Sequence, residues 1–344
     1  MPRPTNALPT SQPHQGWILH ALYIVAGMLL AALFAAADFG ADSDKTAYAL
    51  YFDAIAHNLG VPTGFERIEP GFYGFTWLVS HITESAYTYF WLIFSFQFFG
   101  ITSFWGKRSP LFRDGIYSAL LWLAFPMFYS LSLNVLRQGM ALVFVIYALD
   151  AELTGRRYRP FVLIGLGALF HASTLIFAPA LLILRLNWRL RTFLLIWLLC
   201  VVAAAAMLPQ QLVALLANAI PPGISEQYPY YFSYLTGELA ETYDTGLKLR
   251  FLAFSAIPIL AWVMVRQFRF AVDRDCLQVL KLYLLLNALF FFIGHIPFSD
   301  RIALLSWQLM PVIGLGLTPQ PRKPVAASLA LLSAIALISY FVIL

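Results

Sequence analysis

Charged residues are scarce in this sequence. Asp, Glu, Lys and Arg make up 11% of its 344 residues, whereas soluble domains typically have about 25%. Hydrophobic residues make up 60%, and the mean hydropathy is +0.74. A soluble fold of this composition would leave far too much apolar surface in water. The chain is therefore predicted to be an integral membrane protein.

Cysteines are few, and several common motifs are absent. The two cysteines are Cys200, within an apolar run, and Cys276, beside the charged stretch "FAVDRDC". We expect no disulfide between them and assign them no redox role. The sequence has no Walker loop, no GxGxxG after a strand and no HExxH, so no motif supports nucleotide-dependent or zinc-protease chemistry. We expect no cofactor and no nucleic acid partner.

Apolar runs are abundant, and they predict an all-α polytopic membrane protein. A membrane span takes about 20 residues. Eleven runs, several of them short, are predicted to be spans: Trp17 to Ala37, Ser85 to Trp105, Phe112 to Leu131, Arg137 to Leu149, Pro160 to Phe170, Ser173 to Leu184, Thr192 to Leu208, Leu249 to Val265, Leu277 to His295, Ile302 to Leu317 and Val325 to Ile343. The first run resembles a signal peptide, because "FAAADFGAD" is similar to a cleavage site. Its apolar core is longer than the usual length of about 7 to 15 residues, so a retained helix is favoured.

The distribution of basic residues predicts the orientation, because Lys and Arg gather in short cytoplasmic loops. With the N-terminus inside, 16 of the 22 Lys and Arg residues are cytoplasmic, and 12 of the 17 Asp and Glu residues are outside. This orientation folds Pro160 to Leu184 into a hairpin with His171 at its tip. A single helix over those residues would invert everything that follows.

Two long loops, residues 38–84 and 209–248, lie on the predicted outer side of a single membrane domain that comprises residues 1–344. The first loop includes "GFERIEPGFYGFTWLVSHITES", whose amphipathic run of about 13 residues is too short to span. We expect this run to lie in the membrane interface or to re-enter. Because every inner loop is short and basic, the outer face is predicted to be the working face.

Three arginines open predicted spans on the outer side: Arg137, Arg250 and Arg301. Each alone could extend to the outer headgroups or pair with a neighbour such as Asp300. Three guanidinium groups at one level would instead form a receptor for phosphate or pyrophosphate, which they can bind with bidentate hydrogen bonds.

His171, in "ALFHASTLIFAP", is the second polar residue in an apolar setting. It could be a structural histidine whose hydrogen bonds are satisfied. At the tip of a hairpin it would face the same outer cavity as Arg137, where it could donate to phosphate or take a proton from a hydroxyl. Glu69, Asp53 and Asp300 are the acidic candidates.

Two further patterns allow more than one interpretation. "DSD", from Asp42 to Asp44, resembles the Asp-x-Asp of metal-dependent sugar transferases, but we interpret it as solvated acids and predict no metal site. "YPYYFSYL", from Tyr228 to Leu235, offers aromatic faces, including that of Tyr230, on which sugar rings could stack. An ordinary aromatic belt at the membrane interface explains the same run.

Four segments carry a resemblance to a known family. They are "EPGF" (Glu69 to Phe72), "NVLRQGMALVFVIYAL" (Asn134 to Leu149), the basic turn "GRRYR", and "ALFHASTLIFAP" (Ala168 to Pro179). In this order they resemble the EpsG family of exopolysaccharide polymerases, relatives of the Wzy-type O-antigen polymerases. The specific part is Asn-x-x-Arg-Gln followed about 33 residues later by Phe-His-x-Ser. The resemblance is best from Asp38 to about Leu184.

The resemblance implies an architecture like that of the GT-C membrane glycosyltransferases and a metal-independent polymerase. Such an enzyme joins undecaprenyl-pyrophosphate-linked oligosaccharide repeat units on the periplasmic face of a bacterial inner membrane. Its partners are the lipid-linked oligosaccharide, the lipid bilayer and, as a candidate, a chain-length regulator. Catalysis is assigned to Arg137, His171, Arg301 and Glu69. Substrate binding is assigned to Arg250, Gln138, Asn134, Arg67, Asp300 and Tyr230.

Other classes share parts of this pattern. A lipid-linked glycan flippase or other transporter would use the same basic cavity but would need access from both sides, and usually shows internal repeats, which the sequence does not show by eye. A membrane acyltransferase would leave the outer arginines unexplained. An O-antigen ligase-like transferase shares nearly all of the chemistry, so polymerase and ligase, like the sugar and the linkage, stay open at this stage.

Overall fold

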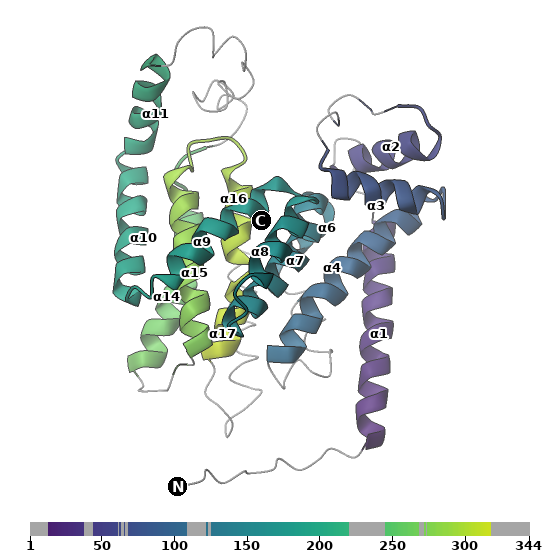
Figure 1. Ribbon diagram of the computed structural model, residues 1–344, viewed down its shortest axis with the longest axis horizontal. Helices are drawn as coiled ribbons and strands as arrows, with labels where there is room; N and C mark the ends of the chain where they lie inside the picture. The colour runs from purple at the N-terminus through teal and green to yellow at the C-terminus, as the bar shows by residue number, and fades with distance from the viewer. Residues whose placement is uncertain are drawn as a thin grey trace.

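The computed structural model describes residues 13–37, 44–60, 62, 65, 68–108, 122, 125–219, 245–267, 272 and 274–317. The regular elements of these residues are helices, with one short 3-10 helix, η2 (Figure 1). They are α1 (Pro13–Ala36), α2 (Asp44–Ala56), α3 (Pro70–Ser80), α4 (Ala86–Arg108), α6 (Pro126–Leu133), α7 (Leu136–Leu153), α8 (Arg159–Ala168), η2 (Ala172–Ile176), α9 (Phe177–Arg185), α10 (Leu190–Ala205), α11 (Leu208–Ala219), α14 (Leu249–Gln267), α15 (Arg274–Phe292), α16 (Ser299–Trp307) and α17 (Met310–Leu317).

The expected all-helical membrane fold is confirmed in its coarse form. Among the described residues, α14 and α15 are long and apolar enough to cross a membrane, and α10 with α11 would be a third crossing if these helices, bent by 74°, form one span. The count of about eleven spans and the GT-C-like architecture stay predictions. The expected span Val325 to Ile343, and most of Phe112 to Leu131, lie outside the described residues.

Two expected segments are divided differently in the structure. A turn at Gln308 and Leu309 separates α16 from α17 within the expected span Ile302 to Leu317. Pro311 contributes to this break, because a proline in the first turn of α17 has no N–H to donate to a preceding turn of helix. The expected outer loop of residues 209–248 begins as α11 and is described only to Ala219 and again from residue 245.

The segment from Pro160 to Leu184 is a hairpin, as expected. It comprises α8, the short helix η2 and α9, and His171 precedes η2 at the tip. Arg185, at the end of α9, donates to the carbonyl of Arg157 at 3.0 Å, and its Nη2 also contacts Glu152 Oε2 at 2.6 Å. The chain therefore returns to the level at which α8 begins.

α1 and α4 form an antiparallel pair (Figure 1). Tyr23 shares a 2.5 Å hydrogen bond with Thr102, and further along the pair the Trp91 indole donates to the carbonyl of Met28 at 3.3 Å. Gly27 allows the close approach, because a Cβ there would lie 2.6 Å from Phe98 and Phe99 ring atoms. This is the small-residue packing that helices use in membranes.

The helices α2 and α3 lie across the ends of α1 and α4 and form a cap (Figure 1). A separate hydrophobic cluster holds the cap in place, and its largest members are aromatic side chains of α2, α3 and α4. Lys45, in the first turn of α2, donates to three carbonyls at the end of α1, those of Phe34, Ala35 and Ala37, at 2.6 to 2.9 Å. The ammonium therefore binds carbonyls at the C-terminal end of α1 and complements the helix dipole there.

A buried polar network joins α10, α14, α15 and α16. The Asn287 amide donates to Ser255 Oγ at 3.1 Å and to Ser306 Oγ at 3.0 Å, and it accepts from the Trp197 indole at 2.7 Å. Trp307 donates to Ser255 Oγ at 2.9 Å. A satisfied network of this kind specifies how apolar helices pair, because a misplaced helix would leave these groups without partners.

The bundle has two chemically different ends. The cap end carries α2, α3, the tip of the α8–α9 hairpin and the first turns of α7 and α16. The basic end carries the turn of residues 154–159, the end of α9 and the start of α15, and its exposed basic residues include Arg156, Arg157, Arg189 and Arg274. By the positive-inside rule the basic end is predicted to be cytoplasmic.

This orientation predicts which residues a membrane-impermeant thiol reagent labels in spheroplasts, whose inner membrane is intact. In a Cys200→Ala, Cys276→Ala background, Glu84→Cys at the cap end should be labelled without permeabilisation. Arg156→Cys at the basic end should be labelled only after permeabilisation. Both positions are exposed, so access depends on the side of the membrane, and labelling of Arg156→Cys in intact spheroplasts would contradict the orientation.

Candidate functional site

Three segments that are far apart in the sequence meet at the cap end around the carboxylate of Glu69. Arg137, in the first turn of α7, donates from Nη1 to Glu69 Oε2. His171 Nδ1 lies 3.0 Å from Glu69 Oε1, and the backbone N–H of Ala172 donates to the same oxygen at 3.2 Å. The side chains of Glu69, His171 and Arg137 are 15%, 18% and 23% exposed. We call these three residues, together with Tyr48, which accepts a hydrogen bond from Arg137, the Glu69 cluster.

The sequence "EPGF" explains how Glu69 is positioned. Glu69 is the N-cap of α3 but makes no side-chain capping bond, so its carboxylate is available to other segments. Pro70 follows at the first helical position, where a missing N–H costs nothing. The N–H groups of Gly71 and Phe72 donate instead to the carbonyl of Leu169 at 2.7 and 3.2 Å. The start of α3 is thereby docked on the chain just before His171.

Gly71 is required by this docking. A Cβ at residue 71 would lie 2.7 Å from the Leu169 carbonyl oxygen and 2.8 Å from Leu169 Cβ, which is closer than real side chains approach. Gly74, one turn further along α3, has open space in the same position. The glycine of the "EPGF" segment therefore sets the distance between Glu69 and His171.

A second hydrogen bond, to Tyr48, helps to hold the Arg137 guanidinium in place. Arg137 Nε donates to the Tyr48 hydroxyl at 2.8 Å, and Nη1 donates to Glu69. An arginine side chain has five N–H groups, so the Nη2 amino group and one hydrogen of Nη1 are not used by contacts within the described residues. Arg137 is thus held rigidly while part of its fork stays available to an anion.

Arg301, at the start of α16, lies on the same side of the molecule. It is close enough to Asp44 and to Tyr48 to interact with both electrostatically. Its backbone carbonyl accepts a 2.6 Å hydrogen bond from the Gln138 amide, which ties α16 to the first turn of α7. Its guanidinium lies 4.5 Å from the centre of the Phe298 ring. Phe298 has a left-handed backbone, with φ of 61°.

The pKa values of the Glu69 and Asp44 carboxyl groups are shifted in opposite directions. Burial alone would raise the pKa of Glu69, but the hydrogen bond from His171 and the charge of Arg137 outweigh burial and lower the pKa to about 2. Burial raises the pKa of Asp44, against the lowering effect of Arg301 and Arg137. Because Glu69 is ionised, it has no proton to donate, so His171 Nδ1 donates the hydrogen. In the neutral imidazole the lone pair is then on Nε2.

The other residues assigned from the sequence lie in several environments. Gln138 is buried, and its amide N–H is engaged by the backbone of Arg301. Asn134 is exposed where α6 ends, and Arg250 and Asp300 are also exposed. No contact of the described residues joins Asn134, Arg250 or Asp300 to the Glu69 cluster. Arg67 and Tyr230 lie outside the described residues.

Sequence reasoning missed Tyr48 and undervalued Asp44. Both lie on α2, four residues apart and therefore on one face of the helix, which is the signal that could have linked them. Asp53, considered as an acidic candidate, lies elsewhere: it is exposed and 3.2 Å from His57. Asp42 lies outside the described residues. Among the residues that the structure describes, no group of three or more His, Cys, Asp or Glu side chains has a metal-binding arrangement.

The fold and the site together define a helical membrane protein with a partly buried Arg–Glu–His cluster at one end. The sequence profile of the EpsG family matches residues 20–344. The chain therefore belongs to the EpsG family, and this membership is confirmed over far more of the chain than the motifs alone cover. Comparisons with curated proteins and with solved structures gave no match. The family indicates a function of the polysaccharide-polymerase type.

The close contact between Gly71 and Leu169 can be tested by comparing alanine substitutions at Gly71 and Gly74. Gly71→Ala should lower the melting temperature of the detergent-solubilised protein, because an added methyl group in a packed site typically costs about 1 to 3 kcal/mol. Gly74→Ala should leave the melting temperature unchanged or raise it, since alanine is favoured over glycine within helices by about 1 kcal/mol. Equal melting temperatures for the two variants would show that the contact with Leu169 does not hold the cap.

The low pKa of Glu69 predicts how its contribution to stability depends on pH. A carboxyl group whose folded-state pKa is lowered contributes fully above its unfolded value, here 4.5, and loses that contribution as pH falls toward about 2. The difference in melting temperature between the wild type and Glu69→Gln should therefore shrink as pH falls from about 4.5 toward about 2. Glu84→Gln, at an exposed position, is the control and should show no such trend. A difference that stays constant down to pH 3 would contradict an ionised, paired Glu69.

Proposed function

We propose that this protein is a polysaccharide polymerase that joins polyprenyl-pyrophosphate-linked oligosaccharide repeat units. The observation that carries the proposal is the Glu69 cluster, in which one ionised carboxylate orients both an arginine and a histidine. Transfer from a glycosyl pyrophosphate needs two things: the developing charge on the leaving pyrophosphate must be neutralised, and an acceptor hydroxyl must be oriented and deprotonated. The cluster supplies one group for each.

Arg137 is the group for the pyrophosphate. Its guanidinium is held by Tyr48 and Glu69, and its remaining N–H groups can bind two phosphate oxygens in a bidentate manner. Arg301 adds a second positive charge on the same side. A fixed guanidinium stabilises charge without reorganising during the reaction, and therefore substitutes for a metal ion in this step.

His171 is the group for the acceptor. The acceptor hydroxyl oxygen attacks the anomeric carbon of the donor sugar, and the bond between that carbon and the pyrophosphate oxygen breaks. The hydroxyl proton passes to His171 Nε2, and the polyprenyl pyrophosphate leaves with the bonding electron pair. Glu69, by accepting from Nδ1 at 3.0 Å, holds the ring in the tautomer that has its lone pair on Nε2 and stabilises the imidazolium that forms.

The depth of the site suits a lipid-linked substrate. From Arg137 to Glu152, α7 advances fifteen residues, or about 22 Å at 1.5 Å per residue. The hydrocarbon core of a bilayer is about 30 Å thick. If Glu152 and Arg185 lie at the cytoplasmic boundary, Arg137 lies roughly 8 Å below the outer boundary of the hydrocarbon core. A pyrophosphate drawn to this depth leaves water, and its attraction to Arg137 is strengthened.

The two neighbouring functions are separated by what the protein makes. A ligase-like transferase would use the same residues but move a finished glycan once, whereas a polymerase extends its own product. A flippase would need the arginines but has no use for a base held by a carboxylate. Purified protein incubated with one lipid-linked repeat unit should therefore give a ladder of products under the polymerase proposal, and a single transferred product or none under the others.

Two substitutions test the roles within this assay, run with EDTA because no metal is expected to take part. Arg137→Lys keeps the charge but loses the planar fork, and it should reduce the rate roughly 100- to 1000-fold, by analogy with the loss of an oxyanion donor. His171→Gln should reduce it roughly 100- to 10,000-fold, which is the usual contribution of a general base.

Arg189→Lys is the matched control, because Arg189 is exposed at the basic end, and it should keep the wild-type rate. Rates are compared per folded protein, measured by the melting transition of each variant. Near-normal polymer from Arg137→Lys would remove the support for pyrophosphate binding by this arginine. Full loss in EDTA that magnesium or manganese restores would replace the arginine mechanism with a metal-dependent one.

A further inference from the structure

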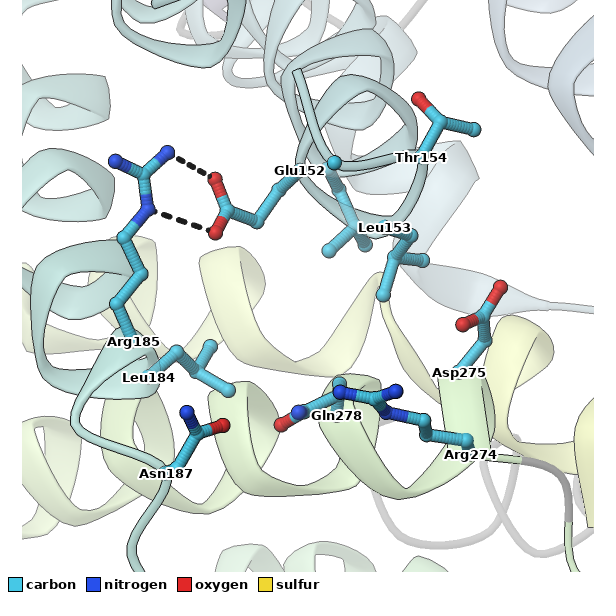
Figure 2. Close-up of a pocket in the computed structure, with 11 residues that line it drawn as sticks. Glu152, Leu153, Thr154, Leu184, Arg185, Asn187, Arg274, Asp275 and Gln278 are labelled. Carbon is cyan, nitrogen blue, oxygen red and sulfur yellow. Dashed lines mark hydrogen bonds and ion pairs between the residues drawn. The ribbon is translucent and has the colours of Figure 1, made fainter. Parts of the chain in front are cut away.

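A polar cavity lies at the basic end, on the side of the molecule opposite the Glu69 cluster. It has a volume of about 480 Å³ and lies between the ends of α7 and α9 and the first turns of α15 (Figure 2). This volume is within the usual range of small-molecule sites, roughly 300 to 1,000 Å³. None of its lining residues takes part in the proposed reaction.

One wall of the cavity is electrically neutral and rigid. Glu152 and Arg185 form a bidentate pair, with distances of 2.9 and 2.6 Å, which Figure 2 shows at one side of the cavity. Arg185 donates in addition to the carbonyl of Arg157 at 3.0 Å. Because Glu152 neutralises its charge, Arg185 shapes the cavity without adding net positive charge to it.

The opposite wall carries the charged side chains of Arg274 and Asp275, whose charged groups lie apart in Figure 2. The Arg274 side chain lies along this wall toward Gln278 (Figure 2). No carboxylate of the described residues forms an ion pair with Arg274, and Lys281, two turns further along α15, is close enough to repel it electrostatically. An arginine in this setting favours an anion, and its fork fits a phosphate best.

The cavity also contains an amide group that lacks a partner. The Gln278 carbonyl oxygen is buried and has no hydrogen-bond partner among the described residues. A buried acceptor left unpaired costs about 1 to 3 kcal/mol, so a ligand that brings a donor to it gains that amount. The ligand that fits both Arg274 and Gln278 is therefore an anion that carries its own hydroxyl or ammonium donor.

The position of the cavity indicates where such an anion comes from. The basic end is the predicted cytoplasmic end, and basic pockets between helices at that level bind anionic lipid headgroups. The leucines Leu149, Leu153 and Leu184 line the same cavity and offer apolar surface for the glycerol portion of a lipid. We propose that this cavity binds the phosphodiester headgroup of an anionic, hydroxyl-bearing phospholipid of the phosphatidylglycerol type, with the phosphate on Arg274 and a headgroup hydroxyl donating to Gln278.

Occupancy of this cavity stabilises the helices that carry the Glu69 cluster. Besides the start of α15, the lining includes the ends of α7 and α9, whose opposite ends carry Arg137 and approach His171. A headgroup bridging α15 to these ends holds them in register. Since a ligand that binds only the folded state raises its stability by mass action, the lipid should raise the melting temperature of the whole protein.

The test is a titration of full-length protein in detergent with phosphatidylglycerol, with melting temperature and native mass spectrometry as readouts. The wild type should show a saturable rise in melting temperature and a discrete bound lipid. Arg274→Gln and Gln278→Leu should each weaken binding at least fivefold. Arg189→Gln, which removes an exposed arginine at the same end without touching the cavity, should bind as the wild type does. Melting temperatures without added lipid verify that each variant is folded.

Three results would overturn the proposal. Unchanged binding by Arg274→Gln would exclude the cavity as the site, and equal weakening by Arg189→Gln would show non-specific attraction to the basic end. Saturation by phosphatidylcholine at the same affinity would exclude recognition of an anionic headgroup. Inorganic phosphate and soluble glycerophosphoglycerol form a further arm: if either one matches the affinity of the lipid, the phosphodiester site stands but the membrane is not its source.

Discussion

The carboxylate of Glu69 is the interaction on which the arrangement of the cap end depends. It receives hydrogen bonds from the Arg137 guanidinium, the His171 ring and the backbone of Ala172. These donors belong to α7 and to the tip of the α8–α9 hairpin, so one carboxylate joins three segments. A charged group that is largely removed from water is stable only when it is paired and hydrogen-bonded in this way. The same constraint holds the arginine and the histidine in defined orientations.

The cost of placing these groups away from water is offset by the structure around them. The N–H groups at the start of α3 are satisfied by the Leu169 carbonyl, and the aromatic cluster of the cap packs beneath. The carbonyls at the end of α1 are satisfied by Lys45. The contact with Leu169 fixes the level of Glu69 relative to His171, and the Lys45 bonds tie α2 to α1. The geometry of the site therefore depends on helix ends, where backbone groups are free to bond with other segments.

The two ends of the bundle combine the same residue types for different purposes. At the cap end, a glutamate orients an arginine whose remaining N–H groups stay available. At the basic end, Glu152 binds Arg185 with two hydrogen bonds, and Arg274, which forms no ion pair with a carboxylate of the described residues, lines the cavity. Whether an arginine is structural or available to a ligand thus depends on which of its N–H groups the protein itself uses and whether a carboxylate binds it bidentately.

Much of this protein could be predicted from its sequence. Composition determined the membrane class, and the basic turns determined that Pro160 to Leu184 folds back with His171 at its tip, because both depend only on local hydrophobicity and charge. The motifs around Glu69, Arg137 and His171 identified the family. The sequence did not reveal that these three side chains meet at one carboxylate, nor that Tyr48 completes the site, since pairing across 68 to 102 residues depends on how the helices dock. The cavity beside Arg274 was likewise decided only by tertiary structure, because its walls come from α7, α9 and α15. The sequence does not show that Arg185 is paired with Glu152, whereas Arg274 has no ion pair among the described residues.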